Sequence, residues 1–113
     1  RWEETLANAW ASMIWVYAAD PESGERHYRA RMFAPGINVP EDPATGSAAV
    51  TFAGFLAARS RVRNGTLAWT IDQGVEMGRP SRLEIEADKL DGAITALRVG
   101  GQAVLVSEGT MAI

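Results

Sequence analysis

The segment from Gly46 to Arg59 constrains the fold more than any other part of this sequence. It reads GSAAVTFAGFLAAR, so small or apolar residues cover almost the whole circumference of a helix until the charge at Arg59. A helix that is apolar on nearly every side is typical of one that is buried on nearly every side. Its alanines and glycine also keep it thin, so that strands can approach it closely. We therefore expect the rest of the chain to wrap around this helix.

The flanking sequence supplies short β segments separated by turn residues. A short amphipathic helix is expected over 2–12, followed by a hairpin of strands 13–19 and 27–33 and a proline-rich loop over 34–43. Asn64-Gly65 is the strongest short signal for a hairpin, and further strands are expected at 67–72, 82–88, 93–99, 102–107 and 110–113. This pattern predicts one α+β domain, with antiparallel β structure around one buried helix.

Composition excludes several classes of function. The 113 residues carry 11 Lys and Arg against 14 Asp and Glu, a net charge of −3 without the basic face that nucleic acid requires. There is no cysteine, which excludes disulfide scaffolds, thiolate metal sites and cysteine catalysis, and the single His27 excludes a His-rich zinc site. No apolar run approaches the ~20 residues that cross a membrane. Without a visible signal peptide we expect a cytoplasmic protein, with neither nucleic acid nor membrane as partner.

Residues 41–49 (EDPATGSAA) are the strongest candidate for a functional site. Free backbone N–H groups at the first turn of the helix, with the helix dipole behind them, form a ready site for an anion. Gly46 lets a ligand approach the backbone, and Ser47 adds a hydroxyl, so a small carboxylate or phosphate would fit. The same residues also suit an ordinary helix start with Thr45 as the N-cap, and from the pattern alone this second interpretation is the commoner one.

Three other features are less informative. Gly74, Gly78 and Pro80 interrupt the strand pattern of residues 73–81, which often marks a bend where something else comes close. Arg79 could face a substrate anion or form a structural ion pair, and we leave it out of the catalytic set. His27 has no acidic neighbour in the sequence, and we expect it to be an exposed strand residue rather than a base.

Several motifs together resemble a known family. Residues 31–36 (RMFAPG), 41–49 (EDPATGSAA), 73–74 (QG) and 77–81 (MGRPS) occur in the order seen in the PhzF-like family of phenazine-biosynthesis isomerases, which is related in fold to diaminopimelate epimerase. Residues 100–104 (GGQAV) and 109–111 (GTM) resemble that family's ending. The resemblance spans almost the entire chain.

The resemblance implies a fold of two similar domains, each a barrel-like β shell around a central helix, with the active site in the cleft between them. This sequence resembles only the second of them. We therefore expect residues 1–113 to be a single C-terminal-type domain whose N-terminal domain is absent, and the opening residue Arg1 in place of Met agrees with that expectation.

The resemblance also implies roles for particular residues. Asp42 would lie in the cleft beside the substrate, as the catalytic candidate, and Thr45, Gly46 and Ser47 would bind the substrate's carboxylate. The implied reaction moves a proton from an activated carbon to another position, without metal or cofactor. The glutamate thought to shuttle that proton belongs to the first domain, and Glu41 is not that glutamate. The isolated chain would then be inactive, with a small carboxylate-bearing molecule as substrate and the family's N-terminal domain as partner.

Two other interpretations stay open. In the first, the chain is a free-standing domain that pairs with a second copy of itself as a homodimer, and it binds a small anion without isomerase activity. In the second, the domain has lost catalysis and serves as an interaction module. A native reading frame starting near Arg1 would favour the first of these.

Overall fold

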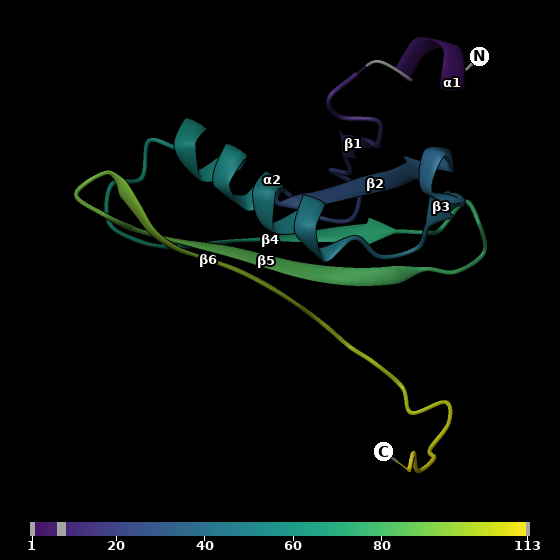
Figure 1. The fold of residues 1–113 in the computed structure, drawn as a ribbon. Helices are drawn as coiled ribbons and strands as arrows, with labels where there is room; N and C mark the ends of the chain where they lie inside the picture. The colour runs from purple at the N-terminus through teal and green to yellow at the C-terminus, as the bar shows by residue number, and fades with distance from the viewer. Residues whose placement is uncertain (1, 7–8, 113) are drawn as a thin grey trace.

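The described part of the chain, in a computed structural model, comprises residues 2–6 and 9–112. In chain order its elements are α1 (Trp2–Leu6), β1 (Ile14–Ala19), β2 (His27–Ala34), the 3₁₀ turn η1 (Pro35–Ile37), β3 (Val39–Asp42), α2 (Gly46–Arg59), β4 (Gly65–Gln73), β5 (Ser81–Leu90) and β6 (Ala93–Gly101) (Figure 1). None of the helices in these ranges has the length and apolar character needed to cross a membrane.

The six strands form one sheet in the order β1-β2-β4-β5-β6, with β3 paired to β2. Neighbouring strands are antiparallel except β2 and β4, which run parallel. Their parallel pairing follows from the crossover through β3 and α2 that joins them. Because β1 and β6 lie at opposite ends of the strand order, the sheet stays open. The α+β class is confirmed, whereas the barrel-like and wholly antiparallel shell is wrong.

The core lies between α2 and one face of β4 and β5. Side chains alternate between the two faces of a strand, so every second residue of these strands turns toward the helix. The buried residues are Leu67, Trp69 and Ile71 of β4, Leu83, Ile85 and Ala87 of β5, and Ala49, Phe52, Ala53 and Ala57 of α2. The predicted alternation at 67–72 and 82–88 is therefore confirmed, although each strand is slightly longer than expected.

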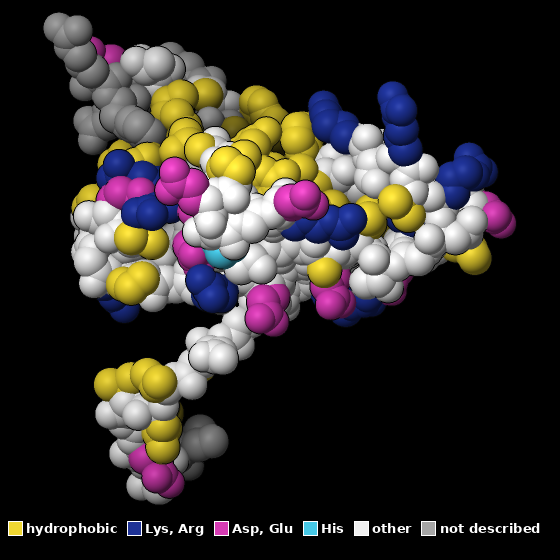
Figure 2. Space-filling model, turned by 180° about the vertical axis from the view of Figure 1, so that it is seen from behind, with side chains coloured by type: hydrophobic (Ala, Val, Ile, Leu, Met, Phe, Trp, Pro, Cys, Tyr) yellow, Lys and Arg dark blue, Asp and Glu magenta, His cyan; other side chains and the backbone are white. Residues whose placement is uncertain are grey.

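Helix α2 is thin, as predicted, but it is not enclosed. A Cβ placed on Gly54 would lie 3.2 Å from Leu97 Cδ1, which shows how closely the helix approaches β6. The opposite side of α2 carries Ser47, Thr51 and Phe55, which are exposed. The expectation of burial on nearly every side is wrong because the open sheet covers one side of the helix only. Hydrophobic side chains consequently remain at the surface, and Figure 2 shows such side chains gathered along the upper part of the body.

Lys89 is the only lysine of the sequence, and its side chain is directed into the core. Its Nζ donates to the carbonyl oxygens of Ala57, at 3.0 Å, and Ser60, at 3.1 Å. These carbonyls lie at the C-terminal end of α2, where a helix leaves acceptors unsatisfied and where its dipole favours a cation. Lys89 therefore joins the end of α2 to β5.

His27 differs from its expected position. It is only 8% exposed, and its Nε2 lies 2.7 Å from Asp72 Oδ2. The parallel pairing of β2 with β4 brings these residues together, a contact that their separation along the sequence hides. Arg82 also donates to Asp72, and these hydrogen bonds, that from Arg82 foremost, hold the pKa of Asp72 below its usual value.

Two local expectations near the turns are wrong. Helix α1 comprises Trp2–Leu6 among the described residues, residues 7–8 of the expected helix lie outside them, and residues 9–12 are not helical, so the helix expected over 2–12 is too long. Asn64-Gly65 does not close a hairpin, because it lies between α2 and β4. Asn64 Oδ1 instead accepts the Asp91 N–H at 2.8 Å, and this supports the real hairpin turn at Asp91-Gly92, where φ is 51° and 88°.

The C-terminal segment also differs from expectation. Strand β6 extends to Gly101, and residues 102–112 then form no strand, so the strands expected at 102–107 and 110–113 are wrong as far as the described residues reach; Ile113 lies outside them. In Figure 1 this segment leaves the sheet and extends away from it. Within the described part of the chain, residues 102–112 pair with no strand of the sheet.

Candidate active site

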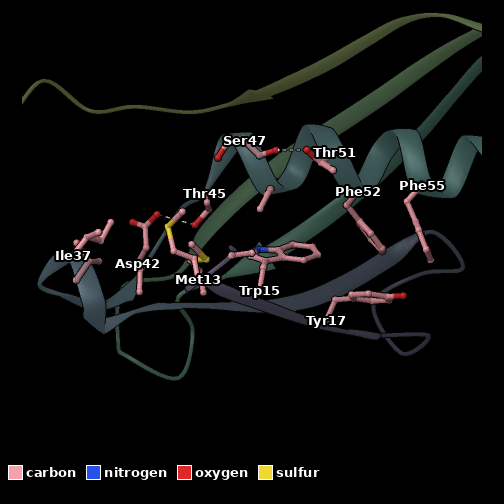
Figure 3. A pocket seen from close by; sticks show the side chains of 15 residues that line it. Met13, Trp15, Tyr17, Ile37, Asp42, Thr45, Ser47, Thr51, Phe52 and Phe55 are labelled. Carbon is pink, nitrogen blue, oxygen red and sulfur yellow. Dashed lines mark hydrogen bonds between the residues drawn. The ribbon is translucent and has the colours of Figure 1, made fainter. Parts of the chain in front are cut away.

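A hollow of about 800 Å³ lies along the exposed side of α2, between the helix and the β1–β2–β3 side of the sheet. Most of its wall is apolar, with Met13, Trp15 and Tyr17 on one side and Phe52 and Phe55 on the other. In Figure 3 the rings of Tyr17, Phe52 and Phe55 lie at one end of the hollow, and Trp15 lies between them and Asp42. Such a mostly apolar concavity with a few polar groups is typical of a small-molecule site.

The polar end of the hollow is built from the residues between β3 and α2. Asp42 is the last residue of β3, Thr45 is the residue before α2, and Ser47 lies in the first helical turn. All three line the hollow, as Figure 3 shows, and Gly46 stands between them at the helix start. The structure thus brings together the four residues that the sequence analysis selected.

Thr45 occupies the N-cap position without performing the capping that the alternative interpretation expects. Its backbone is extended, with φ −118° and ψ 90°, but its side chain makes no capping hydrogen bond. The hydroxyl instead donates to Asp42 Oδ2 at 2.7 Å. An α-helix leaves its first N–H groups without carbonyl partners. Because Thr45 caps none of them, the amides of Gly46, Ser47 and Ala48 stay without a hydrogen-bonding partner among the described residues.

Asp42 and Glu41 are adjacent carboxylates in different surroundings. Arg31 binds Glu41 through two hydrogen bonds, of 2.8 Å from Nε and 3.1 Å from Nη2. These bonds hold the pKa of Glu41 below its usual value and raise the pKa of Arg31. Successive residues of a strand face opposite sides, so Asp42 lines the hollow while Glu41 is held in an ion pair. This arrangement leaves Asp42 as the carboxylate available to a ligand.

Gln73 is the site residue that sequence reasoning missed. It ends β4 with its side chain fully buried, and its Nε2 donates to the Asp42 backbone carbonyl at 2.7 Å and to Thr45 Oγ1 at 2.8 Å. Its Oε1 accepts the Trp15 indole N–H at 3.0 Å. The sequence did contain a signal that the Gln73 side chain is buried, because Gln73 continues the alternation of Leu67, Trp69 and Ile71.

Gly74 and Arg79 lie in the other motif, residues 73–81. A Cβ on Gly74 would lie 2.9 Å from both the Cα and the carbonyl oxygen of Pro43, so the bend predicted here is the place where the Asp42-Pro43 segment comes close. Arg79 is exposed, and it does not line the hollow. Within the described ranges, no group of three or more His, Asp and Glu side chains is placed to hold a metal ion.

Comparison with known proteins decides which family this site belongs to. The family model described as phenazine biosynthesis-like protein matches residues 1–109. The chain belongs to the phenazine biosynthesis-like (PhzF-like) family. The resemblance seen in the ordered motifs is therefore confirmed, and the motifs at residues 41–49 and 73–81 are the ones that meet at the polar end of the hollow.

Curated relatives are similar to this chain over part of their length. A protein of Mesorhizobium japonicum named an uncharacterized isomerase is 40% identical over 99 residues, covering 88% of this chain and 33% of the relative. The trans-2,3-dihydro-3-hydroxyanthranilate isomerase of Pseudomonas aeruginosa is 43% identical over 84 residues, covering 74% and 30%. A Schizosaccharomyces pombe relative named antisense-enhancing sequence 1 is 34% identical over 82 residues, covering 73% and 27%. The chain thus spans about a third of the length of these relatives.

Proposed function

We propose that this chain supplies the substrate-anchoring half of the active site of a cofactor-independent isomerase, which moves a proton on a small carboxylate-bearing molecule. The observation that carries the proposal is the position of Asp42 and the first turn of α2 at the polar end of an apolar hollow. Family membership supports the reaction class, because relatives of this chain bear the name of isomerases.

In this proposal the backbone amides of Gly46 and Ser47, with the Ser47 hydroxyl, bind the substrate's carboxylate at the positive end of the α2 dipole. Thr45 lines the same site and holds Asp42, whose carboxylate accepts a hydrogen bond from an amine or hydroxyl of the substrate. As the proton leaves the activated carbon, negative charge accumulates, and fixed N–H donors beside an apolar wall offset it without reorganising. The same contacts orient the substrate for the transfer.

In this proposal, the group that takes up and returns the proton lies outside this chain. The resemblance assigns the proton-shuttling glutamate to the other domain of the family's fold, and Glu41 is occupied by Arg31. We therefore propose that activity belongs to a full-length protein in which a further domain covers the hollow, and that the chain by itself binds weakly and does not catalyse the reaction.

An NMR titration with 3-hydroxyanthranilate, a stable aromatic carboxylate, tests the anchoring site. The amides of Gly46, Ser47 and Ala48 should shift on addition of the probe, and Asp42→Asn should weaken binding roughly threefold to tenfold, the value of one hydrogen bond. Glu41→Gln, which alters the neighbouring carboxylate, is the matched control and should bind as the unmodified chain does. Equal weakening by both substitutions, or shifts confined to other parts of the chain, would refute the assignment.

The alternative function, a self-associating domain that binds a small anion without isomerase activity, is favoured by the exposed apolar wall of the hollow. Tyr17 is 47% exposed and Phe55 is 39% exposed, although both rings contact Phe52. Light scattering over a range of concentrations separates the two proposals. A discrete dimer would support the alternative, whereas a monomer that aggregates as concentration rises would support a half-site that lacks its covering domain.

A further inference from the structure

Gln73, whose side chain is fully buried, lies at the centre of a series of hydrogen bonds that ends on Asp42. A primary amide has two N–H donors and one carbonyl acceptor, and all of them are used here. The bonds join Gln73 to Trp15 on β1, to the end of β3 and to the residue that precedes α2. A buried side chain whose donors and acceptor are all satisfied holds the groups around it in one arrangement.

The donor and acceptor roles in this series of hydrogen bonds are fixed at both of its ends. The Trp15 indole N–H can only donate, so it selects Oε1 of Gln73 as its partner and turns the amide nitrogen toward Asp42 and Thr45. The Asp42 backbone carbonyl can only accept, and it selects the same orientation of the amide. The orientation of the Gln73 amide is therefore determined by a donor on one side and an acceptor on the other.

The orientation of Gln73 decides what the Thr45 hydroxyl does. Because Thr45 Oγ1 accepts a hydrogen bond from the Gln73 amide, its own O–H points elsewhere, and the acceptor within reach is Asp42 Oδ2 at 2.7 Å. A threonine at an N-cap otherwise tends to accept hydrogen bonds from the amides of the helix. The network thus diverts Thr45 from the helix and leaves those amides open, while the other Asp42 oxygen, Oδ1, has no partner in the described part of the chain.

We propose that Gln73 is the positioning residue of this site, and that the relay Trp15–Gln73–Thr45–Asp42 sets the direction of the Asp42 carboxylate and keeps the first turn of α2 free for an anion. The proposal rests on the proposed function in one respect, which is that Asp42 and the helix amides are taken as the groups that meet the substrate. Gln73 itself does not line the hollow and acts through Thr45.

The first test uses NMR of the chain without ligand. In Gln73→Met, which keeps the volume and removes the hydrogen bonds, the Trp15 indole N–H should shift and exchange faster with solvent. The amides of Ser47 and Ala48 should shift as well, because the released Thr45 hydroxyl turns to cap the helix. Gln102→Met, at an exposed position, is the control and should change neither signal. Unchanged Trp15 and Ala48 signals in Gln73→Met would overturn the relay.

The second test asks whether the residues act in series. Gln73→Met and Thr45→Val should each weaken 3-hydroxyanthranilate binding by a similar factor, roughly threefold to tenfold. The double variant should bind no more weakly than either single variant, because residues acting through one path are not additive. Thr45→Ser keeps the hydroxyl and should restore binding. Additive losses, or a Thr45→Ser variant as weak as Thr45→Val, would show that Gln73 only stabilises the fold.

The proposal can still be tested if Gln73→Met does not fold or if the probe does not bind. If Gln73→Met does not fold, Trp15→Phe keeps an aromatic ring in the wall of the hollow, removes the indole N–H that fixes the amide, and should still shift the Ser47 and Ala48 amides; a spectrum unchanged there refutes the proposal. If the probe does not bind the unmodified chain while the ligand-free signals respond as described, the relay stands and the proposed function fails. The two proposals can therefore fail separately.

Discussion

Gly74 occupies a position that excludes any side chain. Its φ is +78°, in the left-handed region, and a Cβ would lie 2.9 Å from the Pro43 backbone and closer still to the Arg79 carbonyl oxygen. Gly78, four residues further along, has a similar φ of +73° but no atom within 4 Å of its hypothetical Cβ. The two glycines therefore separate backbone strain from steric overlap.

Gly74→Ala should lower the free energy of unfolding by more than about 2 kcal/mol, because the strain of a left-handed residue adds to a clash with two backbone segments. Gly78→Ala should cost only the strain, about 1–2 kcal/mol. Urea unfolding of the two variants measures the difference. Equal losses would mean that Pro43 yields easily to the new methyl group.

At this scale the sequence predicted which candidate residues lie together better than it predicted the hydrogen bonds among them. Asp42, Thr45, Gly46 and Ser47 do lie together at the start of a helix, because a turn followed by a helix places consecutive residues close to each other. Gln73 belongs to a motif that the sequence showed, but its role was not predicted because its partners lie on other elements and only the fold brings them to it. The diversion of Thr45 from capping also depends on that distant amide.

At the scale of elements, β5 and β6 are joined on the outer face of the sheet by a charged cluster. Arg98 donates to both oxygens of Asp88, at 2.7 and 2.6 Å, and to Glu86 at 2.9 Å. Thr66 of β4 also donates to Asp88. The hydrogen bonds from Arg98, followed by that from Thr66, lower the pKa of Asp88 from 3.8 to about 2.

The pKa of Asp88 predicts how stability depends on pH. A carboxyl whose pKa is lower in the folded state stabilises the fold above its unfolded pKa, and this contribution disappears as pH falls through the folded pKa. Asp88→Asn should therefore be less stable than the unmodified chain at pH 7, and the gap should close between about pH 4 and pH 2. Arg98→Met should show the same window in urea unfolding. A gap that does not change with pH would contradict this assignment.

Patterns within one element were predicted correctly where one face is buried and the other is polar. Strands β4 and β5 alternate in this way, and their ranges were found to within about two residues. The hairpin expected at Asn64-Gly65 was wrong because a turn signal does not specify which strands it joins. Here Asn64 accepts a hydrogen bond from Asp91 and supports the Asp91-Gly92 turn. The strands expected after residue 101 have suitable composition, but a strand also requires a neighbour.

At the scale of the whole molecule, the open sheet leaves an apolar face beside α2. The barrel-like shell could not be tested from local patterns, because closure depends on whether the first and last strands meet, and β1 and β6 lie at opposite ends of the order. An exposed apolar face of this kind is typical of a surface that contacts another molecule.

Phe55 offers a direct test of that surface, because its ring is 39% exposed and lies under the Arg59 guanidinium, 3.7 Å away. Phe55→Ser should reduce concentration-dependent association of the chain and change the free energy of unfolding by only about 1 kcal/mol. Sedimentation velocity at several concentrations measures the association. Unchanged association in the variant would place the contact surface elsewhere on the molecule.

The burial of Lys89 gives the folded chain an unusual chemical property. It is the only lysine, only 7% exposed, and its ammonium is held by two carbonyls at the end of α2. Acylating reagents that consume surface lysines in most proteins will find no reactive lysine side chain here until the end of the helix lifts from the sheet. The rate at which Lys89 becomes acylated, followed by peptide mass spectrometry, therefore times the opening of α2 without any engineered label.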